Sequence, residues 1–216
     1  MTRCVALLGG TYDPVHHGHV ALGALFAGLL HADELRVIPA GSPWQKSTLQ
    51  AAPEQRAEMV RLAFAGQPYR VVVDCQEIER GTPTYTIDTL RQVRAELGAE
   101  ASIAFLMGAD QLQRFDTWHE WRKLFDYAHF CVAARPGFTL SGAGLPVAVA
   151  EEFSRRAGTP EQLRATPFGL TCLAPDLALD ISATRIRAAL QRGDKPDSLI
   201  SPVVLDYIEQ HNLYKN

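Results

Sequence analysis

The sequence lacks an excess of basic residues, a pair of closely spaced cysteines and a long hydrophobic run. Its formal net charge of −3 argues against a broad nucleic-acid-binding surface, which normally carries a basic excess. The apolar run over residues 20–30 is too short to cross a membrane. We therefore expect neither nucleic acid nor a membrane as a partner, and an anionic ligand would be held by local charges and backbone amides.

The four cysteines are far apart in the chain, at Cys4, Cys75, Cys131 and Cys172, without a C-x-x-C pair. Three of them lie in or beside apolar runs, which indicates buried free thiols in a reducing compartment. No signal-peptide pattern precedes the first apolar run. The sequence therefore predicts a cytoplasmic protein.

Short apolar runs alternate with helix-like segments, and we find no internal repeat, low-complexity tract or linker. This alternation implies right-handed crossovers and a mainly parallel sheet. We expect one doubly wound, Rossmann-like α/β domain over residues 1–216, with about six strands and a helical C-terminus. The strands are predicted at residues 4–8, 34–39, 69–73, 102–107, 129–134 and 170–173. Helices are predicted at residues 20–30, from 53 onward, about 85–97, 182–192 and 202–210, and a helical stretch is expected around Trp118 and Trp121. The pattern is weaker over residues 138–168, where a helix is predicted only at 145–156.

Residues 9–19, with the sequence GGTYDPVHHGH, connect the first predicted strand to the first predicted helix. Ligand sites in open α/β sheets lie at such connections. The stretch matches neither G-x-G-x-x-G nor G-x-x-x-x-G-K-[ST]. It nevertheless offers backbone amides at a helix N-terminus, together with His16 and His19 on one face. These groups suit phosphate oxygens, since histidine donates hydrogen bonds as a neutral ring or as a cation.

Two other interpretations of the histidines stay open. His16, His17 and His19 could hold a metal ion, although no nearby cysteine or carboxylate pair completes a tetrahedral set. They could instead be structural residues that cap a turn. In the phosphate-binding interpretation His17 is a bystander.

Residues 9–16 with Gly18 and His19 resemble the GG-[ST]-[FY]-D-P-x-H-x-G-H signature of the nucleotidylyltransferase superfamily. Members transfer a nucleoside monophosphate from a nucleoside triphosphate and release pyrophosphate. Residues 181–187, ISATRIR, resemble the second motif of that superfamily, ISSTxIR, with Ala183 where many members have serine. One hydroxyl is therefore missing from the second motif.

The second motif also has a local interpretation. Ser182 suits the N-cap of a helix, and Thr184 and Arg187 share a face at i, i+3. That face offers a hydroxyl and a guanidinium to phosphate oxygens. The alternative is an ordinary capped amphipathic helix with solvated arginines.

Several segments between the motifs resemble the bacterial nicotinate-nucleotide adenylyltransferases, among them PWQK at 43–46, ERGTPTYTIDTL at 79–90 and RPG at 135–137. Phosphopantetheine adenylyltransferases resemble the two motifs but lack the TYTIDTL segment. The resemblance implies transfer of AMP from ATP to nicotinate mononucleotide, which gives nicotinate adenine dinucleotide and pyrophosphate in NAD biosynthesis. The alternatives are another phosphorylated acceptor, such as nicotinamide mononucleotide or phosphopantetheine, and a nucleotide-binding sensor without catalysis.

The resemblance also implies roles for individual residues. The residues that contact the reacting phosphates would be His16, His19, Lys46 and Arg187. The ATP site would comprise Gly9, Gly10, Thr11, Tyr12, His16, Gly18, His19, Gly108, Asp110, Ile181, Ser182, Thr184 and Arg187. The nicotinate mononucleotide site would comprise Lys46, Tyr85, Thr86, Asp110, Trp118 and Arg135, with Trp118 stacked on the ring.

Two of these roles have simpler alternatives, because Trp118 could be a core aromatic and Thr86 a helix cap. The expected cofactor is Mg²⁺, bound mainly through the ATP phosphates and without a dedicated set of protein ligands. The sequence does not predict an oligomeric state.

Overall fold

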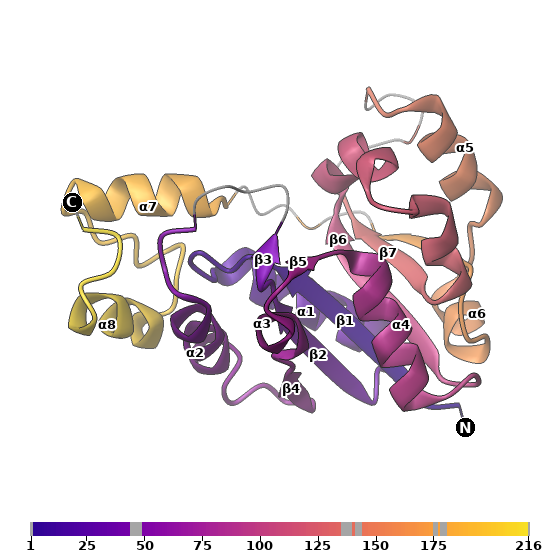
Figure 1. The fold of residues 1–216 in the computed structure, drawn as a ribbon, viewed down its shortest axis with the longest axis horizontal. Helices are drawn as coiled ribbons and strands as arrows, with labels where there is room; N and C mark the ends of the chain where they lie inside the picture. The colour runs from indigo at the N-terminus through magenta and orange to yellow at the C-terminus, as the bar shows by residue number, and fades with distance from the viewer. Residues whose placement is uncertain are drawn as a thin grey trace.

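The computed structural model describes residues 2–43, 49–134, 140, 144–174, 177 and 181–215. Within these residues the chain forms a six-stranded sheet in the order β4-β2-β1-β6-β7-β8, with all neighbouring strands parallel (Figure 1). This confirms the predicted doubly wound α/β fold. The strands are β1 Cys4–Gly10, β2 Glu34–Pro39, β4 Val71–Val73, β6 Ser102–Gly108, β7 His129–Ala133 and β8 Thr171–Ala174. A separate short parallel pair joins β3 Ser42–Pro43 to β5 Pro83–Thr84.

Along the chain, helices follow or connect these strands in the described residues. They are α1 His17–Leu29, α2 Pro53–Ala63, α3 Gln76–Arg80, α4 Thr86–Leu97, α5 Val147–Arg155, α6 Pro160–Ala165, α7 Ala183–Gln191 and α8 Pro202–Gln210. Two 3-10 helices, η1 Ala109–Thr117 and η2 Trp121–Asp126, follow β6. None of the helices found in the described residues is long and apolar enough to span a membrane.

One helix start was predicted too late from the sequence, and two short helices were missed. The helix predicted from residue 20 begins at His17, because His16 takes the extended N-cap conformation and the next residues form the first turn. The segment predicted as a loop after Cys75 contains α3, and the weakly patterned region before residue 168 contains α6. These helices have five and six residues, too few to show a helical period.

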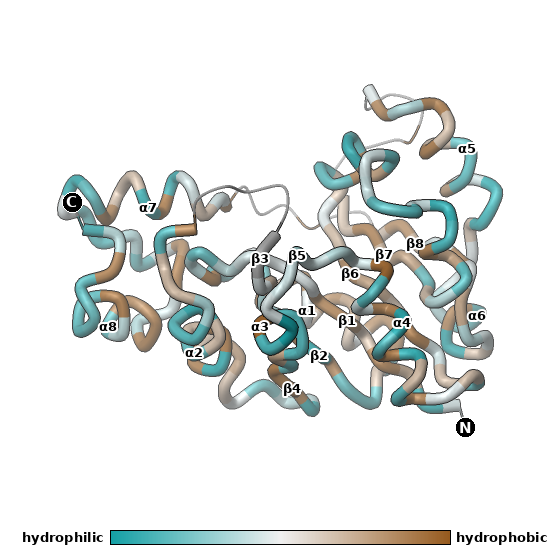
Figure 2. Tube along the Cα trace, in the orientation of Figure 1, coloured by the Kyte–Doolittle hydropathy of each residue, from teal (hydrophilic) through white to brown (hydrophobic). Residues whose placement is uncertain are grey.

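The sheet separates two hydrophobic clusters. Along β1, Cys4, Ala6 and Leu8 face one cluster with α1, while Val5 and Leu7 face the other with α4, as the period of a strand requires. Figure 2 shows hydrophobic residues along the central strands and mixed hydropathy along the covering helices. The cysteines are free as predicted, and all except the half-buried Cys75 are buried.

The order of the strands reverses between β1 and β6, the two central strands. Leu8 on β1 pairs with Leu106 on β6, so the carboxyl ends of these strands lie side by side. Such a reversal is where ligands bind in open α/β sheets. Near this edge the C-terminal part of the chain returns, with α8 packed against α2 (Figure 1).

Candidate active site

His16 and His19 form a stacked pair at the start of α1, directly after β1. Their ring centroids are 3.7 Å apart with an interplanar angle of 29°. The backbone N–H of His16 donates to Nδ1 of His19 at 3.2 Å. A neutral His19 that accepts at Nδ1 carries its hydrogen on Nε2, and Nε2 can then donate to an anion. The expectation that both rings lie on one face is confirmed.

The ring of His16 is neutral at physiological pH. The residue is only 9% exposed, and Nδ1 is a buried atom without a hydrogen-bond partner among the described residues. Burial, and secondarily the neighbouring His17, lowers the pKa of His16 to about 4. The sequence left a neutral donor and a cation both possible for histidine, and the structure favours the neutral donor for His16.

Glycines and a tyrosine support this pair. A Cβ on Gly18 would lie 3.0 Å from Nδ1 of His16, and a Cβ on Gly10 would lie 3.0 Å from the ring of Tyr12. Tyr12 has a φ of 50°, is buried, and donates from its hydroxyl to the Leu8 carbonyl at 2.7 Å. Its ring meets His19 edge-on at 4.9 Å. Tyr12 therefore lies among the predicted ATP-site residues as a support for His19.

The second motif lies beside the first. The hydroxyl of Ser182 accepts from the backbone N–H of Arg185 at 3.3 Å, which confirms the predicted N-cap of α7. Arg187 donates to the hydroxyl of Thr184 at 3.5 Å and to the carbonyl oxygen of Asp13, 174 residues away, at 2.5 Å. Two motifs near opposite ends of the chain thus form one polar site.

Asp13 has a larger role than the sequence indicated. Its carboxylate is 2% exposed and accepts from the backbone N–H groups of Gln50 at 2.9 Å and Ala51 at 3.1 Å. It also accepts from the hydroxyl of Tyr214 at 2.7 Å and lies 3.9 Å from the guanidinium of Arg187. We call these five residues the Asp13 cluster. Asp13 was not among the site residues predicted from the sequence, since its partners are distant in sequence.

Arg56 and Glu77 were also missed, and they fix the backbone around the first motif. Arg56 is fully buried and donates to the carbonyl oxygens of Thr11 at 2.8 Å and Gly41 at 3.2 Å. A Cβ on Gly41 would overlap the carbonyl oxygen of Glu77. Burial raises the pKa of Glu77, whose carboxyl group accepts from Thr89 at 2.7 Å.

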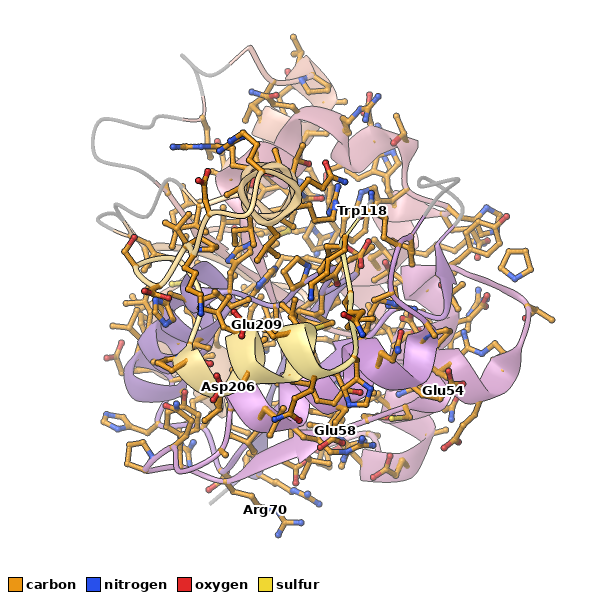
Figure 3. The ribbon with its side chains drawn as sticks, turned by 90° about the vertical axis from the view of Figure 1, so that its left-hand side faces the viewer. Glu54, Glu58, Arg70, Trp118, Asp206 and Glu209 are labelled. Carbon is orange, nitrogen blue, oxygen red and sulfur yellow. The ribbon has the colours of Figure 1, made fainter. Side chains whose placement is uncertain are left out.

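The residues predicted for the nicotinate ring lie on the α4 side of the sheet, where Tyr85 and Trp118 pack against the second hydrophobic cluster. Thr86 is the first residue of α4, Tyr85 is its N-cap, and the Tyr85 ring lies 4.9 Å from that of His119. Trp118 is half-buried, with its ring 5.9 Å from Phe105 in an edge-on contact, and Figure 3 shows it away from the labelled side chains of α2 and α8.

Two further predictions for this region can be compared with the structure. Trp121 is in the core, as expected. Asp110 is exposed in the first turn of η1, and a Cβ on Gly108 would lie 2.6 Å from its Oδ1. Lys46 and Arg135 lie outside the described residues.

Comparison with known proteins identifies the family of this chain. Residues 7–189 match the family described as cytidylyltransferase-like. A probable nicotinate-nucleotide adenylyltransferase of Herminiimonas arsenicoxydans is 63% identical over 216 residues, which cover 100% of this chain and 99% of the relative. One of Chromobacterium violaceum is 44% identical, with 100% of both chains covered. The nicotinic acid mononucleotide adenylyltransferase of Plasmodium falciparum, solved in complex with NaAD, has the same fold, with a TM-score of 0.74, 20% identity and coverage of 98% and 97%.

The fold and the paired motifs define a nucleotidyltransferase built on a Rossmann-like sheet. The chain belongs to the cytidylyltransferase-like family and, within it, to the nicotinate-nucleotide adenylyltransferases. This confirms the family resemblance seen in the sequence.

Proposed function

We propose that this chain transfers AMP from ATP to nicotinate mononucleotide, giving nicotinate adenine dinucleotide and pyrophosphate. The observation that carries the proposal is the stacked pair of His16 and His19 directly after β1, with Arg187 of the second motif bonded to Asp13 in the same turn. This arrangement places neutral and cationic donors together at a helix N-terminus, where a polyphosphate is stabilised. The product places the enzyme in NAD biosynthesis.

The chemistry needs no general base. An oxygen of the 5′-phosphate of nicotinate mononucleotide attacks the α-phosphorus of ATP, and the bond from that phosphorus to the β-bridging oxygen breaks. A phosphate monoester has a second pKa of about 6, so the nucleophile is already ionised at neutral pH. Catalysis then consists of positioning and charge stabilisation. A neutral His16 suits a donor role in such a mechanism.

Each part of the first and second motifs has a role in this scheme. His16 and His19 donate to oxygens of the α- and β-phosphates. Arg187, together with Lys46, neutralises the leaving pyrophosphate or the incoming phosphate. Thr184 supplies a hydroxyl at the start of α7, where Ser182 is the N-cap and position 183 is alanine.

The acceptor is held at the other end of the site. The nicotinate ring stacks on Trp118, and its carboxylate is read by backbone amides near Thr86. A carboxamide is a poorer match for such donors, so nicotinamide mononucleotide is the weaker acceptor. Asp110 accepts hydrogen bonds from ribose hydroxyls, and Tyr85 and Arg135 complete the acceptor site.

We further propose Mg²⁺ as the cofactor and the cytoplasm as the location. The described side chains assigned to the phosphates are imidazoles, a hydroxyl and a guanidinium, which are not the carboxylate ligands that Mg²⁺ prefers. The neighbouring carboxylate of Asp13 is buried and bound to its own donors. Among the described residues, no group of three or more His, Cys, Asp or Glu side chains is arranged to hold a metal. The ion would therefore be bound through triphosphate oxygens and water, and it would neutralise part of the phosphate charge. The buried free thiols support a reducing compartment.

Pyrophosphate release tests this function. The chain is incubated with ATP, Mg²⁺ and one of three acceptors: nicotinate mononucleotide, nicotinamide mononucleotide or phosphopantetheine. We expect the highest kcat/KM with nicotinate mononucleotide. A higher value with another acceptor would contradict the substrate assignment, and ATP binding without release in any mixture would identify a non-catalytic sensor.

A further inference from the structure

One buried carboxylate joins the segments that carry the phosphate-binding residues. In the Asp13 cluster, the Oδ1 atom of Asp13 accepts from the Tyr214 hydroxyl and the Ala51 amide, while Oδ2 accepts from the Gln50 amide. Asp13 also holds Arg187 through its own carbonyl oxygen. Asp13 precedes His16 by three residues, and Gln50 follows the segment that contains Lys46.

Tyr214 reaches this carboxylate from near the C-terminus, across 201 residues of sequence. The segment after α8 turns back because Asn212 and Tyr214 adopt φ values of 52° and 60°. The backbone N–H of Leu213 donates to the carbonyl of Ile208 at 3.0 Å, which ties the turn to α8. Burial and the adjacent Asp13 raise the pKa of Tyr214 well above its usual range, so its hydroxyl keeps its proton and acts as a donor.

The geometry explains why one hydroxyl matters for a distant arginine. A buried carboxylate requires a full set of donors, and removal of one donor leaves it poorly satisfied. Two guanidinium groups interact with this carboxylate. Arg56 is fully buried and held by the carbonyl oxygens of Thr11 and Gly41. Arg187 is half-buried, lies 3.9 Å from Oδ2 and is the one that can still shift. Without the hydroxyl of Tyr214, the carboxylate would draw this guanidinium closer and away from a bound phosphate.

We propose that Tyr214 is a positioning residue for AMP transfer, which acts through Asp13 to hold Arg187 in the orientation that meets a phosphate oxygen. This role rests on the proposed function, since it assigns Arg187 to the phosphates of that reaction. Tyr214 itself does not touch the reacting groups.

The first experiment compares Tyr214→Phe with the full-length wild-type chain in the pyrophosphate assay. We expect kcat to fall about 10-fold, because a small displacement of a charge-stabilising group has a large effect on the transition state. We expect the KM for nicotinate mononucleotide to change less than about 2-fold, because the ring site lies over the other hydrophobic cluster. The matched control is Tyr207→Phe on α8, whose ring packs at a tilt against His211, and it should keep wild-type kcat.

A double-mutant cycle separates positioning from general destabilisation. In an Arg187→Ala background, Tyr214→Phe should lower kcat by less than about 2-fold, because the group it positions is gone. Asp13→Asn should also lower kcat, by releasing Arg187 instead of drawing it closer, because the charge between Tyr214 and Arg187 is gone; the exposed Asp206→Asn of α8 is its control (Figure 3). Thermal melting of each variant shows whether the fold is retained.

Two outcomes would overturn the proposal. Wild-type kcat in Tyr214→Phe would remove the role of the hydroxyl, and an equal loss in both Arg187 backgrounds would mean that Tyr214 does not act through Arg187. A wild-type chain that releases no pyrophosphate would contradict the proposed function as well, and this result is distinct because it is read without any variant.

Discussion

The two ends of the site are built in different ways. The phosphate end, which we define as His16, His19, Thr184 and Arg187, lies over the cluster that contains Tyr12 and Tyr214 and is fixed by hydrogen bonds. The ring end, defined as Tyr85, Thr86 and Trp118, lies against the cluster on the opposite face of the sheet and is fixed by aromatic packing. Polar positioning suits the step where charge moves, whereas an apolar wall suits recognition of a flat ring.

The largest effect should come from a donor at the phosphate end. His19→Ala removes one hydrogen-bond donor to the phosphates, and the loss of one such donor costs about 10²–10³-fold in kcat. We expect that range with the fold retained and a melting temperature lower by about 2–4 °C, because the ring also accepts the cap bond from the His16 N–H. Steady-state pyrophosphate release measures kcat.

The matched control for His19→Ala is His17→Ala in the same turn. Nδ1 of His17 lies 3.3 Å from the carbonyl of Ser198, on the outside of the turn. This variant should stay within about 3-fold of wild-type kcat, a range typical of residues outside the reacting site. Full activity in His19→Ala would contradict the assignment of the phosphate end.

The sequence predicted the residues of the phosphate end, but not the buried polar residues that hold them in place. The period of apolar residues and the two motifs were enough for the parallel sheet, the stacked histidines and the Ser182 cap. The partners of Asp13 and Arg56 could not be predicted, because they are set by tertiary contacts over 15 residues or more. At the ring end, η1 and η2 follow a tighter helical geometry than the expected helix, and their order comes from packing between Phe115 and its aromatic neighbours.

The buried His16 at the phosphate end should also make the free energy of unfolding depend on pH. His16 has a pKa of about 4 in the fold and about 6.5 when unfolded, so the unfolded chain binds more protons between these values. The free energy of unfolding should therefore decrease as pH falls from 6.5 to 4, by at most about 3 kcal/mol for this group. Above pH 6.5 the stabilising contribution of the neutral His16 should be complete.

Urea unfolding of wild type and His16→Gln at pH 7 and pH 5 measures the contribution of His16. The buried His129 has a lowered pKa and contributes in the same direction, so the difference between the two chains isolates His16. The exposed His31→Gln is the control and should keep the wild-type dependence. Equal slopes in wild type and His16→Gln would contradict the neutral state of this ring.

A substitution at the ring end should act on binding and not on the phosphates. Trp118→Ala removes the stacking surface, and stacking of a base on an aromatic side chain is worth about 1–3 kcal/mol. We expect the KM for nicotinate mononucleotide to rise about 10-fold, with the KM for ATP changed less than about 2-fold. Trp121→Ala, in the adjacent core, should lower the melting temperature instead. Equal rises in both KM values for Trp118→Ala would show that the two ends are not separate.

The smallest effect concerns the helix that carries Arg187. Ser182→Ala removes the side-chain bond that caps α7, at a cost of about 1 kcal/mol and about 2–4 °C in melting temperature. The matched control is Ser201→Ala, because the described structure shows no side-chain cap bond from Ser201 at the start of α8. We expect kcat to fall less than about 3-fold in Ser182→Ala, since the bonds of Arg187 to Asp13 hold the guanidinium independently of the cap. A larger loss of kcat would show that the local cap, rather than the Asp13 cluster, positions Arg187.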